Sequence, residues 1–543
     1  MSMHGGGPRG LRGLERAARS SMEQGRFGRL FRTLPPAGHS EDALHELALS
    51  MIDPDTADVP IIETEPDDEN PTIPSGYTYL GQFIDHDITF DPISILQARN
   101  DPDALFDFRT PRLDLDSVYG RGPADQPYLF ERHDPVDQPE GDNHRFLLGQ
   151  DQRPESVPAP RPDLPRNTDG LALIGDPRND ENVIVSQLQS LFLRFHNQML
   201  TLVPDSLGRG AQFLETQRQV RWHYQWVVVH DFLPRIVGSE VMNKVLPPEQ
   251  PQPNLDFYRP KADAFMPVEF SVAAYRYGHS MVRPSYSLSS DVLRGSDPAM
   301  NRVPIFSSSN DPLANLRGFR PLSAGWGVDW AFFYPDLPEP PAQRPDGNPY
   351  SPEPDRPLVL PQPSYRIDSV LVEPLAHLPG EPVPMGPSGE LTASLAERNL
   401  QRGRALGLPS GQSVAKRLGE TPMSDEEVWS NADDADLDAK RKEILAAFPQ
   451  FQGNAPLWFY VLREAERTRR VGAEDPNPRG GHHLGPVGGR IVAETLVGLL
   501  ARDHHSYLYQ DPLWKPLAGV GRSDGIFEMS DLIRFTDGTR GEA

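Results

Sequence analysis

The most regular hydrophobic pattern in the chain lies between Glu181 and Leu202, where apolar side chains recur every three or four residues. These positions are Ile184, Leu188, Leu191, Phe192, Phe195 and Met199. Spacings of three and four place side chains on one stripe of an α-helix. Because the stripe persists across the whole stretch, we predict a buried helix of about five turns.

Similar periodicity predicts helices elsewhere in the chain. We expect them over 43–51, 77–88, 216–232, 268–281, 425–447, 458–469 and 489–501. Pro234 should end the helix over 216–232, because proline lacks an amide hydrogen and its ring clashes with the preceding turn. The alternating pattern typical of strands is scarce. The chain is therefore predicted to be mainly α-helical, with little β structure.

Proline and glycine separate the periodic stretches. The chain has 59 Pro and 45 Gly, and they gather between the predicted helices. Pro-rich insertions are expected at about 121–169 and 336–363, the second as a surface loop without regular structure. Residues 1–70 start basic and end acidic, and we interpret them as an N-terminal arm laid over the body. Residues 71–543 are interpreted as one large domain.

Composition narrows the classes of function. Asp and Glu outnumber Lys and Arg by 77 to 53, a formal charge of -24. This charge argues against a nucleic-acid partner and against an anionic membrane surface. The absence of Cys excludes disulfides, thiolate zinc sites and iron–sulfur clusters. A metal must therefore bind histidine and oxygen ligands or arrive inside a cofactor.

Apolar runs in the chain are short. None has the position and length of a signal-peptide core, and none approaches the roughly 20 apolar residues of a membrane span. We therefore expect no membrane span and, by default, a cytoplasmic location. Secretion without a classical signal peptide is the open alternative.

The richest segment chemically is Gly81-Gln82-Phe83-Ile84-Asp85-His86-Asp87. On a helix Gln82 and His86 share one face, whereas Asp85 and Asp87 each lie about 100° around the axis from the histidine. A histidine can shuttle protons near neutral pH, a glutamine can order a water, and a carboxylate can hold a hard cation. The alternative is a capped surface helix with a solvated acidic end.

Two downstream segments carry polar residues at regular spacing. The first has period two: Thr110, Arg112, Asp114 and Asp116. That period puts the four side chains on one side of an extended segment. In the second, Arg178 and Glu181 are three residues apart just before the long buried helix. An ordinary ion pair at the start of that helix is the alternative interpretation.

Two further blocks complete the set. Arg276 precedes His279 by three residues, and Gly278 leaves room for a flat group to approach. Asn399 and Arg402 lie in the last block. In this order the blocks resemble the animal-type haem peroxidases of the peroxidase–cyclooxygenase superfamily. The resemblance runs with gaps from about residue 72 to 527, is closest to the unadorned bacterial members, and implies one large helical catalytic domain over 71–543.

The resemblance implies residue roles on both sides of a haem b. His86 matches the distal histidine, Gln82 its partner in ordering the distal water, and Arg178 the distal arginine. His279 matches the iron ligand. Asn399 matches the residue that orients the iron ligand through its second ring nitrogen.

Other matches concern attachment of the haem. Arg276 and Arg402 fall where the family pairs guanidinium groups with the propionates, for which Arg suits better than Lys. Asp85 and Glu181 match two carboxylates that in this family can form ester bonds to haem methyl groups.

The resemblance also implies a calcium site. Its ligands would be Asp87, Thr110, the backbone carbonyl of Arg112, Asp114 and Asp116. Three carboxylates with neutral oxygens suit a hard cation of coordination number about 6 to 8. Calcium there would hold Asp87, and so the neighbouring His86, against the extended segment.

The chain departs from the family pattern at three places. Asn182 stands where the leukocyte enzyme has a methionine linked to haem, so that third bond is expected to be absent. Residues 403–407 differ from the family's usual sequence after the last arginine. Arg276 replaces the tyrosine that cyclooxygenase-like members carry three residues before the iron-binding histidine.

The expected activity is reduction of hydrogen peroxide through a ferryl intermediate, with oxidation of small organic donors or of halide or thiocyanate. One alternative is a haem-dependent fatty-acid dioxygenase, which the replacement of that tyrosine disfavours. The other alternative is a non-catalytic adhesion or scaffold protein braced by calcium.

Overall fold

The helical character predicted from periodicity is confirmed. The computed structural model describes residues 25–53, 56, 68–89, 106–107, 111–131, 144–248, 250, 252–260, 264–292, 302–307, 311, 313–338, 360–378, 393–469, 479–522 and 524–538. Among these, the α-helices are α1 (Glu41–Leu49), α2 (Gly76–Ile88), α3 (Asp116–Tyr119), α4 (Val183–Met199), α5 (Arg209–Val227), α6 (Leu233–Val245), α7 (Val268–Ser271), α8 (Leu395–Ala405), α9 (Gly411–Leu418), α10 (Asp425–Trp429), α11 (Ala435–Ala447), α12 (Leu457–Ala465), α13 (Pro486–Arg502), α14 (Tyr507–Gln510) and α15 (Met529–Asp537).

The described chain also contains short strands. They are β1 (Gly25–Gly28), β2 (Ile52–Asp53), β3 (Glu69–Pro74), β4 (Phe106–Asp107), β5 (Met266–Pro267), β6 (Ser285–Tyr286), β7 (Val303–Pro304), β8 (Pro363–Tyr365) and β9 (Leu371–Val372). One sheet has the order β4-β1-β5, and the pairs β2–β9, β3–β8 and β6–β7 complete the set. These sheets tie distant segments together and are too small to form a core of their own.

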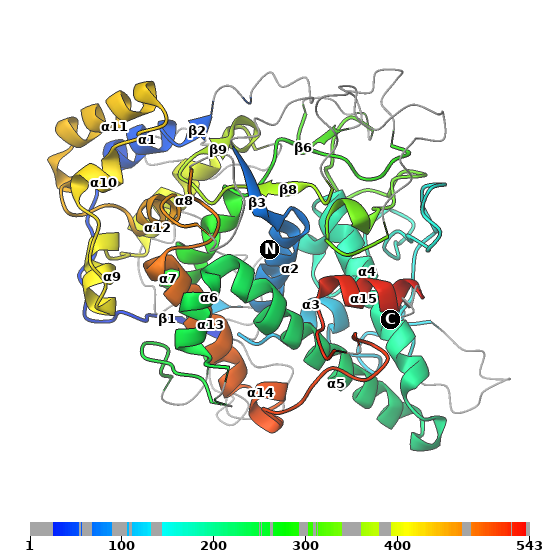
Figure 1. Ribbon diagram of the computed structural model, residues 1–543. Helices are drawn as coiled ribbons and strands as arrows, with labels where there is room; N and C mark the ends of the chain where they lie inside the picture. Colours follow the sequence, from blue (N-terminus) through cyan, green and yellow to red (C-terminus); the bar gives the residue numbers. More distant parts are fainter. Residues whose placement is uncertain are drawn as a thin grey trace, which may run out of the picture.

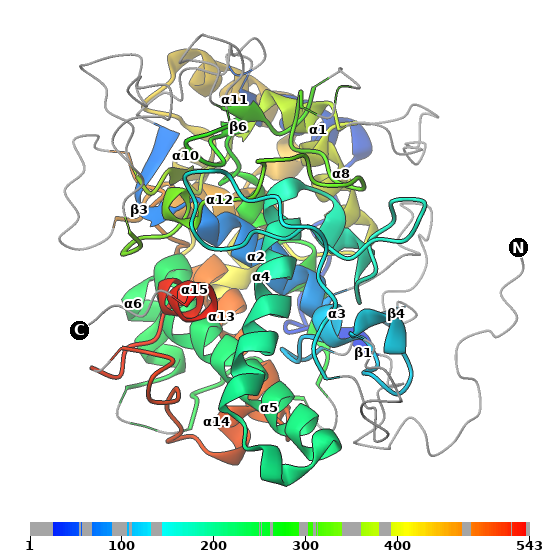
Figure 2. The same ribbon diagram turned by 90° about the vertical axis from the view of Figure 1, so that its right-hand side faces the viewer.

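Helix α2 lies in the middle of the molecule, with α4, α6 and α13 around it (Figures 1 and 2). Most of its residues are buried, and the Phe83 ring stacks on Phe192 of α4 with 4.7 Å between the ring centroids. All six apolar positions predicted for the long helix are buried. The Asn182 side chain accepts a hydrogen bond from the Val185 amide and so begins α4. A buried helix surrounded by other helices can hold polar side chains in a fixed geometry.

The prediction that Pro234 ends a helix is wrong. The chain runs from α5 through a π-helix, η9 (Val228–Phe232), directly into α6, and Pro234 lies in the first turn of α6. The Leu233 amide donates to the Val228 carbonyl five residues earlier, and this wider spacing leaves room for the ring of Pro234. The wider π turn joins the two helices without a break.

Two other predicted helices are each divided in two. The stretch 268–281 forms α7 and a 3-10 helix, η10 (Ala274–His279), separated by non-helical backbone at Ala273. The stretch 425–447 forms α10 and α11, because the side chains of Ser424 and Asp434 each cap a new helix start. The predictions over 43–51, 77–88, 458–469 and 489–501 are confirmed within a few residues.

The segment with period two is not a strand. Its described part bends through 111–115 and enters α3 at Asp116, and Thr110 lies outside the described residues. Burial nevertheless alternates as predicted: Leu113 and Leu115 are buried, whereas Asp114 is partly exposed. The carboxylates therefore share one side, although the backbone is irregular.

The Pro-rich insertions have little regular structure where they are described. In the first, isolated bridges pair Phe130 with Phe146 and Asp151 with Pro162. In the second, residues 339–359 lie outside the described residues, and Pro363 begins strand β8, which pairs with β3. The expectation of a loop without regular structure is therefore wrong at its C-terminal edge.

The described part of the N-terminal segment contacts the body at several points. The Glu269 carboxylate accepts hydrogen bonds from the backbone amides of Leu30 and Phe31, at 3.0 and 3.1 Å. The Arg29 guanidinium donates to the carbonyls of Leu406 and Gly407. None of the described helices combines the length and the apolar character needed to cross a bilayer.

Candidate active site

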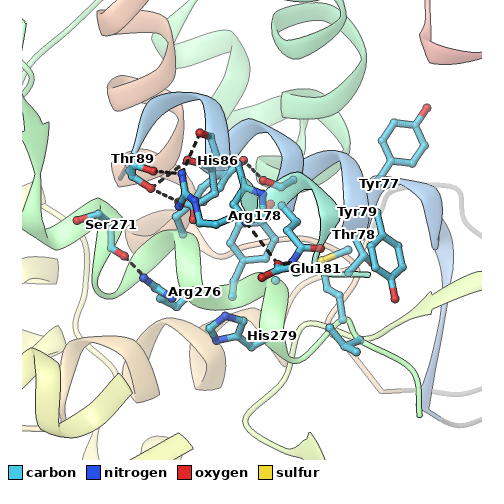
Figure 3. A pocket seen from close by; sticks show the side chains of 18 of the residues that line it. Tyr77, Thr78, Tyr79, His86, Thr89, Arg178, Glu181, Ser271, Arg276 and His279 are labelled. Carbon is cyan, nitrogen blue, oxygen red and sulfur yellow. Dashed lines mark hydrogen bonds and ion pairs between the residues drawn. The ribbon is translucent and has the colours of Figure 1, made fainter. Parts of the chain in front are cut away.

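A cavity of about 340 Å³ lies between α2, the residues just before α4, helix η10 and α8. Eight of the residues singled out in the sequence line it: Gln82, Asp85, His86, Arg178, Glu181, Arg276, His279 and Arg402. Figure 3 shows His86 and Arg178 on one side of this cavity and Arg276 and His279 on the other. The structure therefore brings together side chains more than 300 residues apart in sequence.

Two short 3-10 helices orient half of these side chains. Arg178 lies in η6 (Pro177–Asp180), with Glu181 at its end, and Arg276 and His279 lie in η10. A 3-10 helix has three residues per turn, so side chains three apart point the same way. Arg178 therefore points toward the cavity together with Glu181, and Arg276 together with His279.

His86 is 5% exposed, and its Nδ1 is held by a hydrogen bond. Its Nδ1 lies 2.7 Å from Oδ1 of Asn179, a distance at which Nδ1–H donates to the amide oxygen. Its Nε2 lies 3.5 Å from a carboxylate oxygen of Glu181. In the neutral ring Nε2 therefore carries the lone pair, on the side where Glu181 lines the cavity.

The Arg178 guanidinium is anchored to the end of α2. It donates to the backbone carbonyls of His86 and Thr89, at 3.0 and 2.5 Å, and to the buried Asp176 carboxylate at 2.8 Å. Asp176 also accepts from the Arg178 amide and so starts η6. Asp176 was not predicted as a site residue, although an acidic residue two positions before Arg178 is a signal for the start of a helical turn.

Two side-chain amides in series hold Glu181. Nε2 of Gln82 donates to its carboxylate, and Nδ2 of Asn182 donates to Oε1 of Gln82 at 3.2 Å. Burial raises the pKa of Glu181, and the nearby charges of His86 and Arg178 oppose that rise. Gln82 therefore positions a carboxylate here, while its predicted role in ordering a water stays a prediction.

The opposite side of the cavity presents a neutral imidazole. Burial and the charge of Arg276 lower the pKa of His279 to about 3. Nδ2 of Asn399 lies 2.8 Å from Nδ1 of His279. An amide nitrogen there donates to a bare Nδ1, whereas the amide rotated by 180° would accept Nδ1–H and leave the lone pair on Nε2. Within the described residues, no protein group bonds to Nε2, which is the arrangement a metal ligand requires.

The residues around His279 fit a haem. A side chain at Gly278 would meet no atom within 4 Å, so the wall is open where a flat ring would lie. Arg276 and Arg402 both line the cavity and suit carboxylate groups. The cavity volume falls among ligand pockets, which range from about 300 to 1,000 Å³.

Aromatic residues line the remaining wall: Phe27, Tyr77, Tyr79, Tyr275 and Tyr277. Burial raises the pKa of all four tyrosines well above the usual value, so they are protonated and neutral. The sequence did not predict Phe27, Tyr77 or Tyr79 as cavity residues, because an aromatic residue at helical or strand spacing is equally typical of core.

A second cluster lies behind the cavity. Carboxylate oxygens of Asp87, Asp114 and Asp116 lie within 4.8 Å of one another. Asp87 is fully buried and accepts from the Leu115 amide at 3.1 Å and the Ser117 hydroxyl at 3.3 Å. Three carboxylates this close repel one another unless a cation lies between them, and their oxygen chemistry suits calcium. The predicted carbonyl ligand Arg112 lies on the same segment.

The sequence matches known proteins over much of its length. The profile of the animal haem peroxidase family matches residues 96–329. Thyroid peroxidase of Sus scrofa is 26% identical over 411 residues, which are 74% of this chain and 38% of the relative. Peroxinectin A of Dictyostelium discoideum is 24% identical over 288 residues, 52% of this chain and 43% of the relative. The chain thus spans less than half the length of these two relatives.

Solved structures share the fold. Peroxidase A from Dictyostelium discoideum superposes with a TM-score of 0.53 at 16% identity, covering 89% of this chain and 87% of that one. The fatty acid alpha-dioxygenase of Oryza sativa gives 0.52 at 14% identity, covering 96% and 80%. At these identities the superpositions establish the helical architecture alone. The family profile over residues 96–329, the relatives and the cavity between His86 and His279 all point to similarity with the animal haem peroxidase family.

Proposed function

We propose that this protein is a haem peroxidase, which reduces hydrogen peroxide and oxidises small organic donors, or halide or thiocyanate. One observation carries the proposal: two imidazoles face one cavity from opposite sides, and their states differ. His279 is neutral with Nε2 unpartnered among the described residues, whereas His86 has Nδ1 fixed by an amide oxygen. This pair supplies one ligand and one base.

His279 would hold the haem iron, and Arg276 and Arg402 would pair with its propionates. The bound haem supplies the iron that accepts peroxide and the electrons that reduce it. The roles of the protein are then orientation, proton transfer and charge. Asn399 keeps Nε2 of His279 directed at the cavity through its contact with Nδ1.

Nε2 of His86 would take a proton from the peroxide and return it to the departing oxygen. Because Nδ1–H stays bonded to Asn179, the proton enters and leaves at one atom only. Arg178, fixed at the end of α2, would place positive charge beside the oxygen on which negative charge develops. The ion pair with Asp176 partly offsets the charge of Arg178 and fixes the position of its guanidinium.

Two finer features belong to the same proposal. Asp85 and Glu181 line the cavity and would form ester bonds to haem methyl groups during turnover. The cluster of Asp87, Asp114 and Asp116 would bind calcium. Helix α2 carries both His86 and Asp87, so calcium would hold the catalytic helix against segment 111–119.

The test is to load the purified protein with haem and record its absorption spectrum during a peroxide titration. We expect a Soret band and peroxide-dependent oxidation of a phenolic donor. His279→Ala should lose the iron coordination, and the matched control His377→Ala, an exposed histidine, should not. A folded protein that binds no haem would refute the proposal. Oxygen uptake with a polyunsaturated fatty acid and no need for peroxide would assign a dioxygenase instead.

Attachment of the haem is tested by acid–acetone extraction after turnover. Pigment retained by the wild type and released from the double variant Asp85→Asn, Glu181→Gln would support the ester bonds. Complete extraction from the turned-over wild type would contradict them.

A further inference from the structure

We propose that Asn179 is a positioning residue that holds His86 in the tautomer with its proton on Nδ1, and that Gln189 of α4 sets the orientation of Asn179. The catalytic meaning of this tautomer rests on the proposed peroxidase function, whereas the tautomer itself does not.

The contacts form a chain of three side chains. Oδ1 of Asn179 lies 2.7 Å from Nδ1 of His86, and Nδ2 of Asn179 donates to Oε1 of Gln189 at 2.8 Å. Asn179 and Gln189 are both fully buried, and His86 is nearly so. No bulk water competes for these groups, so each hydrogen bond strongly constrains the next.

The orientation of the Asn179 amide decides which ring nitrogen of His86 carries the lone pair. With its amide nitrogen committed to Gln189, Asn179 presents only its oxygen to His86. An oxygen can accept Nδ1–H but cannot donate to a bare Nδ1. The lone pair is then left on Nε2, which points toward Glu181 at the cavity.

The same arrangement suits both states of the base. When Nε2 has taken a proton, Nδ1–H still donates to Asn179, so the ring need not turn during proton transfer. The reversed chain, with the Asn179 amide nitrogen at Nδ1, would put the ring proton on Nε2 and leave no lone pair at the cavity. A general base requires the first arrangement.

No role was predicted for the buried side chain of Asn179. Its hydrogen bonds to His86 and Gln189 give it one. Asn179 lies between Arg178 and Glu181 in the sequence, and the 3-10 geometry of η6 turns it away from the cavity and toward α4. The segment Arg178–Glu181 therefore reaches both the cavity and the back of His86.

The tautomer is measured first in the wild-type chain, prepared without haem and with ¹⁵N-labelled histidine rings, at a pH where His86 is neutral. We expect the ¹⁵N shift of a protonated Nδ1 and an unprotonated Nε2, assigned by the missing signals of His86→Gln. A wild-type ring with its proton on Nε2 would overturn the proposal without any substitution at Asn179.

Three variants test the contact. Asn179→Leu keeps the size but removes the acceptor, and we expect loss of the tautomer preference and a peroxide reaction at least about tenfold slower in the haem-loaded protein. Asn179→Asp keeps an acceptor, and Gln189 can turn its unpartnered Nε2 toward it, so the tautomer and most of the rate should return. Asn197→Leu is the matched control, a buried asparagine of α4 bonded to the Phe146 backbone instead.

The outcomes separate this inference from the proposed function. Asn179→Leu with an unchanged tautomer and rate refutes the positioning role, even in an active peroxidase. The expected tautomer in a protein that binds no haem refutes the peroxidase proposal and keeps the structural inference. Equal losses in Asn197→Leu and Asn179→Leu would reduce Asn179 to a general stabilising residue.

Discussion

At the scale of single residues, the polar groups of the cavity are fixed by partners that the sequence does not place beside them. Asp176 holds Arg178, and Gln82 holds Glu181, while Asn399 contacts His279. A buried polar group left without a partner costs about 1 to 3 kcal/mol, so such partners are required for the fold as well as for chemistry. Each side chain is thereby held in one orientation before any ligand arrives.

Arg178→Ala tests the electrostatic role at this scale. We expect the variant to keep haem but to react with peroxide about 100-fold to 1,000-fold more slowly, because a preorganised charge beside the developing oxyanion is lost. Stopped-flow absorbance measures the reaction. Arg153→Ala, at a half-exposed arginine that does not line the cavity, is the control. Wild-type kinetics in Arg178→Ala would remove this residue from the mechanism.

At the scale of elements, irregular helices place the site. The 3-10 helices η6 and η10 line up residues three apart, which an α-helix would separate by about 60°. The π-helix η9 carries Asp231, whose carboxylate accepts from the Tyr77 hydroxyl at 2.8 Å and thereby ties this helix to α2. The carboxylate cluster links α2 to segment 111–119 in the same way, provided a cation offsets its charge.

We expect Asp114→Asn to shift the thermal unfolding midpoint in opposite directions with and without calcium. In a chelator we expect a higher thermal unfolding midpoint than in the wild type, because one of three mutually repelling charges is gone. In millimolar calcium we expect a lower midpoint, because a ligand is lost and binding to the folded state weakens. Asp125→Asn, at an exposed carboxylate paired with Arg121, should change neither midpoint beyond error. A wild-type midpoint that ignores calcium would exclude a calcium site here.

At the scale of the whole molecule, the packed core keeps several histidines neutral. His196 and His223 are fully buried, and burial lowers the pKa of each to about 4. Both rings are satisfied as neutral groups: His196 bonds to Tyr119 and to the His144 carbonyl, at 2.9 and 2.7 Å. These contacts give His196 a structural role.

These histidines make the fold sensitive to acid. A histidine with a pKa of about 4 in the folded state and 6.5 when unfolded costs nothing above pH 7. As the pH falls from 6.5 toward 4, only the unfolded chain takes up the proton, so stability is lost. His196→Gln keeps polar contacts without titrating. Its free energy of unfolding should fall by about 2 kcal/mol less than that of the wild type between pH 7 and pH 5.

Urea unfolding at the two pH values measures this difference, with the exposed His377→Gln as control. An equal pH dependence in His196→Gln and the wild type would show that His196 contributes nothing to acid sensitivity.

Local pattern by itself determined the helical class and the main buried helices, because burial of a helix side leaves a period of three to four in the sequence. It also singled out the segments that carry histidine, arginine and grouped carboxylates, although the pattern alone left structural roles open for them. The resemblance to a known family assigned roles to His86, Arg178 and His279, and all three line one cavity. The break at Ala273 and the helix continuing through Pro234 were not predicted, because both depend on the neighbours against which those segments pack.

Only the tertiary structure decided how the chemical groups are paired. Asn179 and His86 are 93 residues apart, and Asn399 and His279 are 120 apart, so no local period connects them. Their partnership follows from the packing of α2 against α4 and of η10 near α8. Hydrogen bonds act over about 3 Å, and whether two distant groups come that close depends on the assembled core.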